Sequence, residues 1–237
     1  MRFLSPALVL SLILPAAAVR AAEDPPRSEL GTLLGLGVRS LPEYDGSSKQ
    51  ELEVIPVVRY YGRTFFARTT QGTLEGGARA ELAKGLFAGV QLAYVGGNDR
   101  TDVDPGAAIG AHLEWDTAVG PAPVNVLLRV GRHLDSDLGT QADLRGTVGV
   151  YGSHGLLVGV FAQATWASDE WVRSYYTAGS GGLLYSALGV EGAYDLSRQW
   201  VMLASTHVRR LHGDAASSPI TEEKTNYYLS LGLAYRF

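Results

Sequence analysis

The 237-residue chain contains no cysteine and, beyond its N-terminal segment, no long apolar run. Without cysteine, a disulfide framework, a thiolate zinc site and a thiol nucleophile are all excluded. The longest apolar stretches of the remaining chain fall short of the roughly 18 residues that a transmembrane helix needs. A basic excess is also missing, because 20 Lys and Arg face 24 Asp and Glu, which gives a formal net charge of −4. We therefore expect no nucleic-acid partner.

Glycine and apolar residues are both abundant. The chain has 29 glycines, and 46% of its residues are hydrophobic while only 19% are charged. Glycine thus makes up about 12% of the sequence, against about 7% in an average protein. High apolar content together with high glycine and little helical periodicity is unusual for a globular domain.

The N-terminus has the features of a secretory signal peptide. Arg2 provides the positive charge, residues 3–19 are predominantly apolar, and small residues follow up to Ala21. This arrangement predicts cleavage after Ala21 or Ala18. No cysteine follows the apolar run, which excludes a lipoprotein anchor. We expect residues 1–21 to be the signal peptide and residues 22–237 to be one exported domain.

Period-two alternation recurs throughout the exported domain. In the last strand Tyr227, Leu229, Leu231, Leu233, Tyr235 and Phe237 share one face, and small or polar residues occupy the other. An outer-membrane strand needs about ten residues with an apolar lipid face, aromatic ends and a polar lumen face. The pattern therefore predicts an all-β fold, an antiparallel transmembrane β-barrel. We expect strands at 32–41, 51–61, 64–70, 73–82, 85–95, 107–118, 123–133, 142–151, 156–167, 183–194, 199–210 and 226–237.

The lengths of the connections support twelve strands. Even-numbered connections are short, whereas most odd-numbered ones are longer and acidic, as expected for periplasmic turns and extracellular loops. The exception is the short connection at Gln71-Gly72, which falls where a long loop is expected. If residues 51–70 form one irregular strand, ten strands is the alternative.

The C-terminal residues resemble an outer-membrane insertion signal. The stretch from Ser230 to Phe237 places Leu, Leu, Tyr and a final Phe at alternate positions. This pattern matches the strand that the barrel assembly machinery reads, and it predicts that machinery and the outer-membrane lipid as partners. The predicted location is the cell outer membrane of a Gram-negative bacterium.

Three segments also resemble the MipA/OmpV family. They are residues 35–47, with Pro42, Tyr44 and Gly46-Ser47; residues 165–176, with Trp171 and Tyr176 where Tyr and Phe are usual; and the C-terminal segments 213–220 and 232–237. The family's name-giving member is an outer-membrane scaffold that joins a lytic transglycosylase to a bifunctional penicillin-binding protein, and other members are described as porin-like or antigenic. The resemblance implies an outer-membrane barrel and a role near peptidoglycan growth. It transfers no partner-binding residue.

Inward-facing charges are expected to balance in the lumen. Strand phasing directs seven arginines inward, Arg39, Arg59, Arg79, Arg129, Arg145, Arg209 and Arg236. The same phasing directs seven acids inward, Glu53, Glu75, Glu81, Glu114, Asp116, Asp143 and Glu191. Charges removed from water need partners, so we expect paired networks and a narrow or occluded lumen.

Catalytic and metal-binding motifs are weak. His112 or His207 could serve as base of a hydrolase assembled from several strands, but a hydrogen-bonded lumen residue is the favoured interpretation. Asp99, Asp102 and Asp104 could bind a divalent cation, and Trp171, Tyr175 and Tyr176 could form a ligand platform. A solvated acidic loop and ordinary loop packing are the favoured interpretations of these two groups. We assign no catalytic, cofactor-binding or metal residue.

Three functions follow, in order of preference. The first is a non-enzymatic scaffold in the cell envelope, to which the turns 152–155 and 195–198 and the tail 23–27 would contribute. The second is a narrow porin-like channel for small solutes, and the third an outer-membrane hydrolase.

Overall fold

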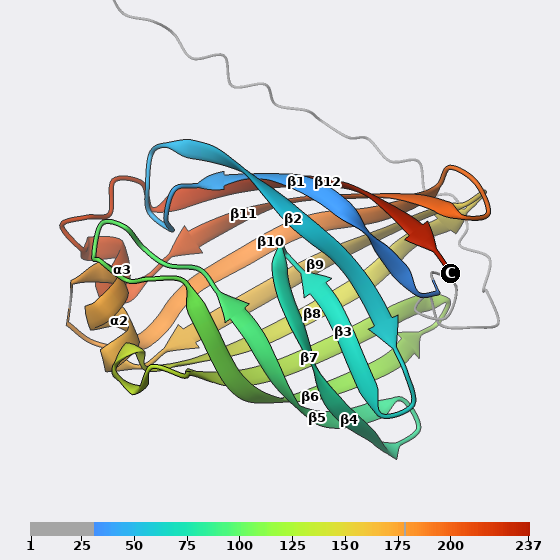
Figure 1. The fold of residues 1–237 in the computed structure, drawn as a ribbon, viewed down its shortest axis with the longest axis horizontal. Helices are drawn as coiled ribbons and strands as arrows, with labels where there is room; N and C mark the ends of the chain where they lie inside the picture. The colour runs from blue at the N-terminus through green and yellow to red at the C-terminus, as the bar shows by residue number, and fades with distance from the viewer. Residues whose placement is uncertain (1–30, 178) are drawn as a thin grey trace, which may run out of the picture.

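The computed structural model describes residues 31–177 and 179–237, in which twelve antiparallel strands form one closed barrel (Figure 1). Each strand pairs with its sequence neighbours, and β1 closes the barrel against β12. The strands are β1 (Leu33–Pro42), β2 (Gln50–Tyr61), β3 (Phe65–Thr70), β4 (Thr73–Ala83), β5 (Leu86–Val95), β6 (Gly106–Val119), β7 (Ala122–His133), β8 (Thr140–Ser153), β9 (Leu156–Ala167), β10 (Gly182–Asp195), β11 (Trp200–Leu211) and β12 (Thr225–Arg236). The twelve-strand prediction is confirmed and the ten-strand alternative is wrong. The predicted signal peptide, residues 1–21, lies outside the described residues, as does the tail 23–27.

Three short helices lie in the longer connections. They are η1 (Ser136–Leu138), α2 (Asp169–Tyr176) and α3 (Gly213–Ser217). Figure 1 shows α2 and α3 together at one end of the barrel, opposite the end at which the C-terminus lies. No helix in the described part of the chain is long and apolar enough to span a bilayer.

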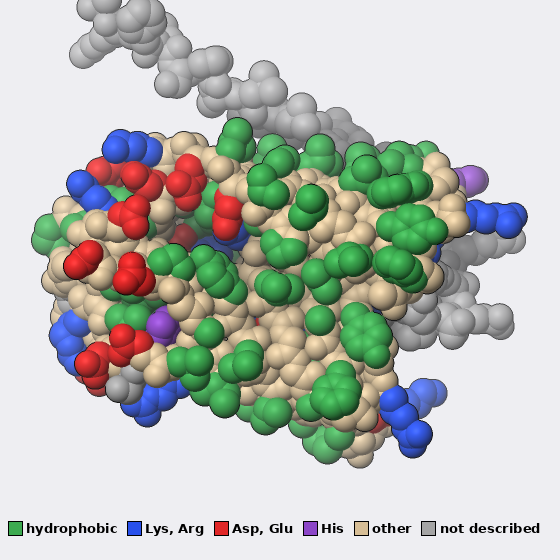
Figure 2. All heavy atoms as spheres, in the orientation of Figure 1, with side chains coloured by type: hydrophobic (Ala, Val, Ile, Leu, Met, Phe, Trp, Pro, Cys, Tyr) green, Lys and Arg blue, Asp and Glu red, His purple; other side chains and the backbone are tan. Residues whose placement is uncertain are grey.

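The outer face of the wall is apolar. Alternate side chains point away from the lumen and are well exposed, such as Leu36 at 66% and Leu52 at 81%. Exposed aromatic side chains lie near the strand ends, namely Tyr60, Phe65, Trp115, Tyr194, Trp200 and Phe237 at one end and Tyr94, Trp166 and Tyr227 at the other. Apolar side chains accordingly cover the wall in Figure 2. An apolar band with aromatic girdles is the surface that a lipid bilayer requires.

The two ends of the barrel differ in their connections. The turns between β2 and β3, β4 and β5, β6 and β7, β8 and β9, and β10 and β11 are short, and they lie at the end that carries the C-terminus. The opposite end carries the longer loops with the three helices. Short turns are periplasmic and long loops extracellular in barrels of this kind. Acidic side chains gather at the extracellular end in Figure 2.

One hairpin is shorter than the rest. β3 has only six residues, and Gln71 and Gly72 join it directly to β4 with φ values of 51° and 82°. Positive φ at both central residues is the geometry of a type I′ hairpin turn, which glycine favours. This turn therefore replaces the long loop expected here, and Figure 1 shows the hairpin turning back before it reaches the extracellular end.

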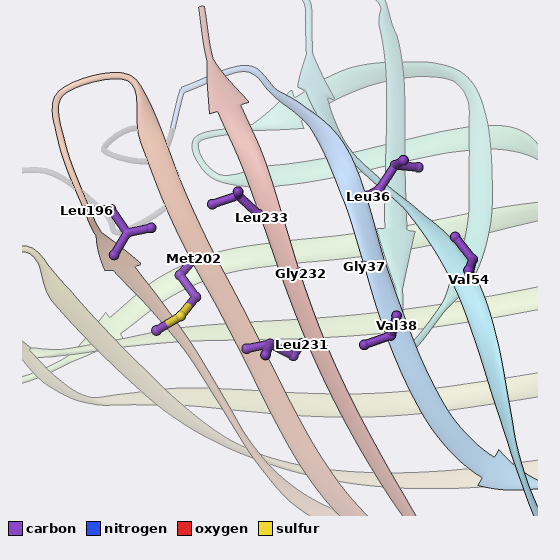
Figure 3. Close-up of a pocket in the computed structure, with 9 residues that line it drawn as sticks. All are labelled: Leu36, Gly37, Val38, Val54, Leu196, Met202, Leu231, Gly232 and Leu233. Atoms are coloured by element: carbon purple, nitrogen blue, oxygen red, sulfur yellow. The ribbon is translucent and has the colours of Figure 1, made fainter.

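A shallow apolar groove of about 470 Å³ lies on the outer face, across the seam between β1 and β12 (Figure 3). It is lined by Leu36, Gly37, Val38, Val54, Leu196, Met202, Leu231, Gly232 and Leu233. Gly37 and Gly232 alternate with outward residues and face the lumen, and the outward leucines and valines beside them form the sides of the groove. Such a surface suits the hydrocarbon chains of surrounding lipid.

Candidate functional site

The middle of the lumen is filled by a cluster of paired charges. Glu75 of β4 accepts hydrogen bonds from Nε of Arg68 on β3 and, at 2.9 Å, from Nη1 of Arg129 on β7. Arg68 also donates from Nη1 to Oε1 of Glu114 on β6 at 3.0 Å. Arg79 lies 3.8 Å from the second oxygen of Glu114. Residues from four nearby strands, β3, β4, β6 and β7, thus meet in the lumen.

This central cluster excludes water. The side chains of Glu75 and Glu114 are 0% exposed, although both point into the lumen. A water-filled pore would leave inward carboxylates accessible from one end or the other. Burial of ionised groups is tolerated only when each is paired and hydrogen-bonded. Arg129 meets this condition by reaching Asp143 at 3.3 Å as well. The lumen is therefore sealed to water around these two side chains.

A second charged group lies nearer the extracellular end. The Arg209 guanidinium is 2.5 Å from Oδ2 of Asp45, and Tyr228 donates its hydroxyl to the same carboxylate. The Arg209 guanidinium also lies 4.0 Å from the ring centroid of Tyr185 and 4.6 Å from that of Tyr228. Asp45 comes from the connection between β1 and β2, so this group ties an extracellular loop to the inner wall.

The helices form an apolar lid over the mouth. Trp171 of α2 stacks on Tyr175 at 4.1 Å between ring centroids, and Tyr176 is only 2% exposed. The Tyr175 hydroxyl donates to the backbone oxygen of Gly96 at 3.0 Å, and the Asn98 amide donates to the backbone oxygen of Tyr175 at 2.8 Å. Burial raises the pKa of Tyr175 to about 12. Trp171, Tyr175 and Tyr176 thus pack against loops, in agreement with the prediction of ordinary loop packing over that of a ligand platform.

A small cavity lies beside Trp171 of α2, near the extracellular end of β6 and β7. Its volume is about 20 Å³, and its lining includes His133, Gln141 and Trp171. That volume has room for about one water molecule. It provides no passage for a solute.

Most of the charges predicted to face the lumen do form pairs. Arg39 pairs with Glu53 at 2.7 Å, Arg145 pairs with Glu191 at 2.5 Å, and Asp116 accepts from Asn125 at 2.9 Å. The remaining arginines use partners near the strand ends, since Arg59 donates to the Gly31 backbone at 2.5 Å and Arg236 pairs with Asp195.

Glu81 differs from this prediction. It is exposed near the periplasmic end and accepts from the backbone N–H of Gly85 at 2.9 Å. Its position beside the β4–β5 turn lets solvent solvate the carboxylate, which therefore needs no lumen cation.

Sequence reasoning missed Arg68 and Asp45. Arg68 alternates with the outward Phe65 and Ala67, so the period-two rule of its short strand already places it inside. Asp45 lies in a connection, and no strand periodicity constrains such a residue.

The histidines form no catalytic triad in the described residues. The rings of His112 and Phe66 meet edge-on at 5.0 Å, and the His207 ring stacks on Tyr228 at 4.4 Å. The ring nitrogens of both histidines are buried without a hydrogen-bond partner, which corrects the expectation that they are hydrogen-bonded. His212 contacts the Ser186 hydroxyl at 2.9 Å, but no carboxylate orients its ring within the described chain.

The predicted acidic loop lies between β5 and β6. Asp102 has a φ of 58° in this loop, and the backbone of Asn98 pairs with that of Val103 across it. Within residues 31–177 and 179–237, no group of three or more His, Asp or Glu side chains is placed to hold a metal ion. Asp99, Asp102 and Asp104 are therefore not assembled as a ligand set.

Comparison with known proteins identifies a family model and similar folds. The model described as "MltA-interacting protein MipA" matches residues 34–237. Among solved structures, the NanC porin aligns with a TM-score of 0.55 at 11% identity, over 87% of this chain and all of its own. A bacterial polysaccharide outer membrane secretin aligns with a TM-score of 0.51 at 11% identity, over 88% of this chain and 99% of its own. No curated protein matches. At this identity the two structures establish the barrel fold.

Proposed function

The chain belongs to the MltA-interacting protein MipA family, and from that premise we propose that it is a non-enzymatic scaffold of the outer membrane. In this role the barrel holds a lytic transglycosylase, and with it a penicillin-binding protein, against the periplasmic face of the membrane. The transglycosylase is proposed as a partner because the family is named for its interaction with MltA. The penicillin-binding protein is proposed because the family's name-giving member joins it to the transglycosylase.

The sealed lumen is the observation that carries the proposal. The full burial of the central Glu75 and Glu114 side chains argues against a water-filled path for a solute. The lid and the Arg209–Asp45 pair add further barriers at the extracellular end. A scaffold needs a stable surface anchored in the membrane and does not need a pore. A closed barrel with a buried charge cluster in its lumen fits this role.

The periplasmic rim is the surface that a partner would contact. Arg63, Lys84 and Arg198 lie exposed on three of its turns. Among the acids of the same rim, Asp195 pairs with Arg236, whereas Glu81 accepts only a backbone N–H and keeps its charge. The three cations outnumber Glu81, and their excess positive charge complements an acidic partner surface.

The turns predicted to contribute, 152–155 and 195–198, are exposed on this rim. They are short, whereas a stable interface buries about 1,200–2,000 Å² in total. We therefore expect a contact of modest affinity that is steered by charge and weakened by salt.

A binding assay tests the scaffold. The barrel in lipid nanodiscs is immobilised, and a purified lytic transglycosylase of the MltA type is passed over it at rising salt. Charge reversal of Arg63, Lys84 and Arg198 to Glu is expected to abolish most of the binding. The matched control Glu223→Lys changes an exposed charge at the opposite end and should leave binding unchanged. Equal binding by wild type and the triple variant would contradict the proposed surface, and no binding by wild type would contradict the scaffold.

A narrow channel is the second candidate, and the polar lining of the lumen favours it. Conduction would require the Glu75 and Glu114 networks to separate. Planar-bilayer recording distinguishes the two functions, because a scaffold with a sealed lumen gives no stable open level. A reproducible open channel in wild type would favour the second candidate instead.

A further inference from the structure

The barrel wall has a gap beside β2 in its extracellular half. β2 pairs with β1 over Gln50–Arg59, but it pairs with β3 only at Arg59, Tyr60 and Tyr61. The residues of β2 before Arg59 thus have no strand partner on that side within the described chain. The cause is the short β3–β4 hairpin, which turns back at Gln71-Gly72. Figure 1 shows the β3–β4 hairpin ending short of the extracellular part of β2.

The opposite side of the gap is the end of β5. β5 pairs with β6 up to Val95, but with β4 only up to Ala93. The positions that β3 and β4 would occupy are therefore empty between β2 and β5. At about 4.8 Å per strand, the width of the gap is on the order of 10 Å. We call this opening the lateral gap. It is bounded by residues 50–58 of β2, by the Gln71-Gly72 turn and by residues 94–95 of β5. Figure 2 shows recessed acidic and basic side chains in this part of the wall.

The exposed edge of β2 is blunted. Thr69 donates its hydroxyl to the Pro56 oxygen at 2.8 Å and accepts from the Val58 N–H at 3.3 Å. These contacts show that the backbone groups of Pro56 and Val58 face the gap, and Pro56 has no N–H to leave unpaired. Proline on an edge strand discourages the addition of another strand. The edge is thus built against β-strand docking.

Polar backbone groups nevertheless remain at the gap. Because peptide groups alternate in direction along a strand, the N–H and C=O of Leu52 and Val54 point to the same side as those of Pro56. The side chains of Leu52 and Val54 face lipid and are 81% and 68% exposed. Hydrocarbon cannot satisfy backbone groups at this depth. The gap therefore requires water or the polar part of a bound molecule.

Carboxylates dominate the inner rim of the gap. Glu53 points inward yet its side chain is 40% exposed, and its partner Arg39 also donates to the Gln71 backbone oxygen. Glu51 is exposed, and the negative charges of Glu53, Glu43 and Asp99 act on it together with the opposing positive charge of Arg39. The nearby cations are engaged, Lys49 with Glu43 at 3.8 Å and Arg100 with Glu222 at 3.7 Å. A rim with this excess of carboxylates attracts cations.

We propose that the lateral gap is a binding site, open to the outer leaflet, for a cationic amphiphile, an apolar chain that ends in a protonated amine. The chain lies against Leu52, Val54 and the outward residues of β5, and the amine reaches through the gap to Glu51 and Glu53. The central cluster below blocks passage to the periplasm, so the molecule is bound and not transported. The site is independent of the scaffold surface, which lies at the other end of the barrel.

Site-specific labels test whether the gap is open to lipid. The chain has no native cysteine, so single-cysteine variants are clean. A fluorophore on Glu53→Cys is compared with one on Ser230→Cys, which also points inward but lies on β12, paired on both sides. In nanodiscs whose acyl chains carry nitroxides, quenching at position 53 should exceed that at position 230 several-fold. Equal protection of the two labels would overturn the proposal.

Calorimetric titration tests the ligand. Dodecylammonium is titrated into the full barrel in phosphatidylcholine nanodiscs, with dodecyl sulfate and dodecyl maltoside as anionic and neutral arms and empty nanodiscs as background. Saturable binding above background is expected for the amine alone. Glu51→Gln should weaken amine binding about three-fold, the effect of one exposed carboxylate, and Glu51→Gln with Glu53→Gln about ten-fold.

Two controls keep this test decisive. Glu170→Gln removes an exposed carboxylate on α2 at the same end of the barrel and should leave amine binding unchanged. Glu51 has no ion pair in the described residues, so its variant is expected to fold as wild type does. Amine binding that is unaffected in the double variant, or equal binding of the sulfate, would overturn the proposal. So would a photocrosslinker at Leu52 that captures a polypeptide strand instead of the amphiphile.

Discussion

Neutralising Glu75 should destabilise the barrel more than any exposed charge substitution. Glu75 accepts hydrogen bonds from Arg68, from Arg129 at 2.9 Å and from the Gln91 amide at 3.0 Å, and its side chain is fully buried. The central cluster balances three arginines with three acids. Glu75→Gln keeps the shape of the side chain but leaves one guanidinium charge uncompensated.

The expected loss in the free energy of unfolding is about 3–5 kcal/mol, which is the cost of breaking a buried ion pair by removing one partner. Because the loss arises from an unbalanced charge, removing one arginine should recover part of it. Glu75→Gln with Arg129→Met restores the balance, and we expect a coupling of about 1–3 kcal/mol between the two sites.

Denaturant titration in detergent micelles measures these differences, with the folded fraction read from the heat-dependent gel mobility of the barrel. The control is Glu170→Gln, whose partner Arg173 lies 3.7 Å away with both side chains half-exposed. That pair should contribute about 0–0.5 kcal/mol. A Glu75→Gln barrel within 0.5 kcal/mol of the control, or a double variant no more stable than the single one, would refute the sealed-cluster argument.

Three further outcomes follow from local geometry. Gly72→Ala should lower the free energy of unfolding by about 1 kcal/mol or more, because φ is 82° and a new Cβ would clash with the Arg39 guanidinium; denaturant midpoints measure this. Ser168→Ala removes the N-cap of α2 and should cost about 1 kcal/mol, seen as faster hydrogen exchange of α2 with the barrel strands unchanged. Hydrogen bonds from Ser48 hold the pKa of Glu222 below its ordinary value, so this contact stabilises the loops above that value and is lost as pH falls through the lowered pKa. Proteolysis of the β1–β2 loop should therefore increase in acid, and Ser48→Ala should reduce that pH dependence, because only the backbone N–H of residue 48 then donates to Glu222.

The sealed lumen and the lateral gap arise from one arrangement of strands. Twelve strands enclose little space, and seven or more inward arginines with their acids occupy it. The same short hairpin that brings Arg68 against Glu75 ends too early to complete the wall. A barrel of this kind offers binding surfaces at its rim and its side, and no conduit.

Much of this architecture was predictable from the sequence. The strands, the outward apolar stripe and the inward Arg39, Arg129 and Arg209 follow from period-two alternation, because each peptide unit reverses the side-chain direction. The signal peptide remains a prediction, since residues 1–21 lie outside the described chain. The family was also predictable, because its motifs in the loops and the last strand are short local patterns of residues.

The sequence by itself determined which residues line the wall and which face the lumen, because alternation is a local property of the chain. Only the tertiary structure decided which charges meet, since Arg68 and Glu114 are 46 residues apart and Arg129 and Glu75 are 54 apart. Those contacts depend on the closure of β1 against β12 and on the shear of the barrel, which set strand heights across the axis. The lateral gap also depends on the tertiary structure. In the sequence the two-residue turn at Gln71-Gly72 predicts an ordinary hairpin, and only the strand pairing shows that β2 and β5 extend beyond it.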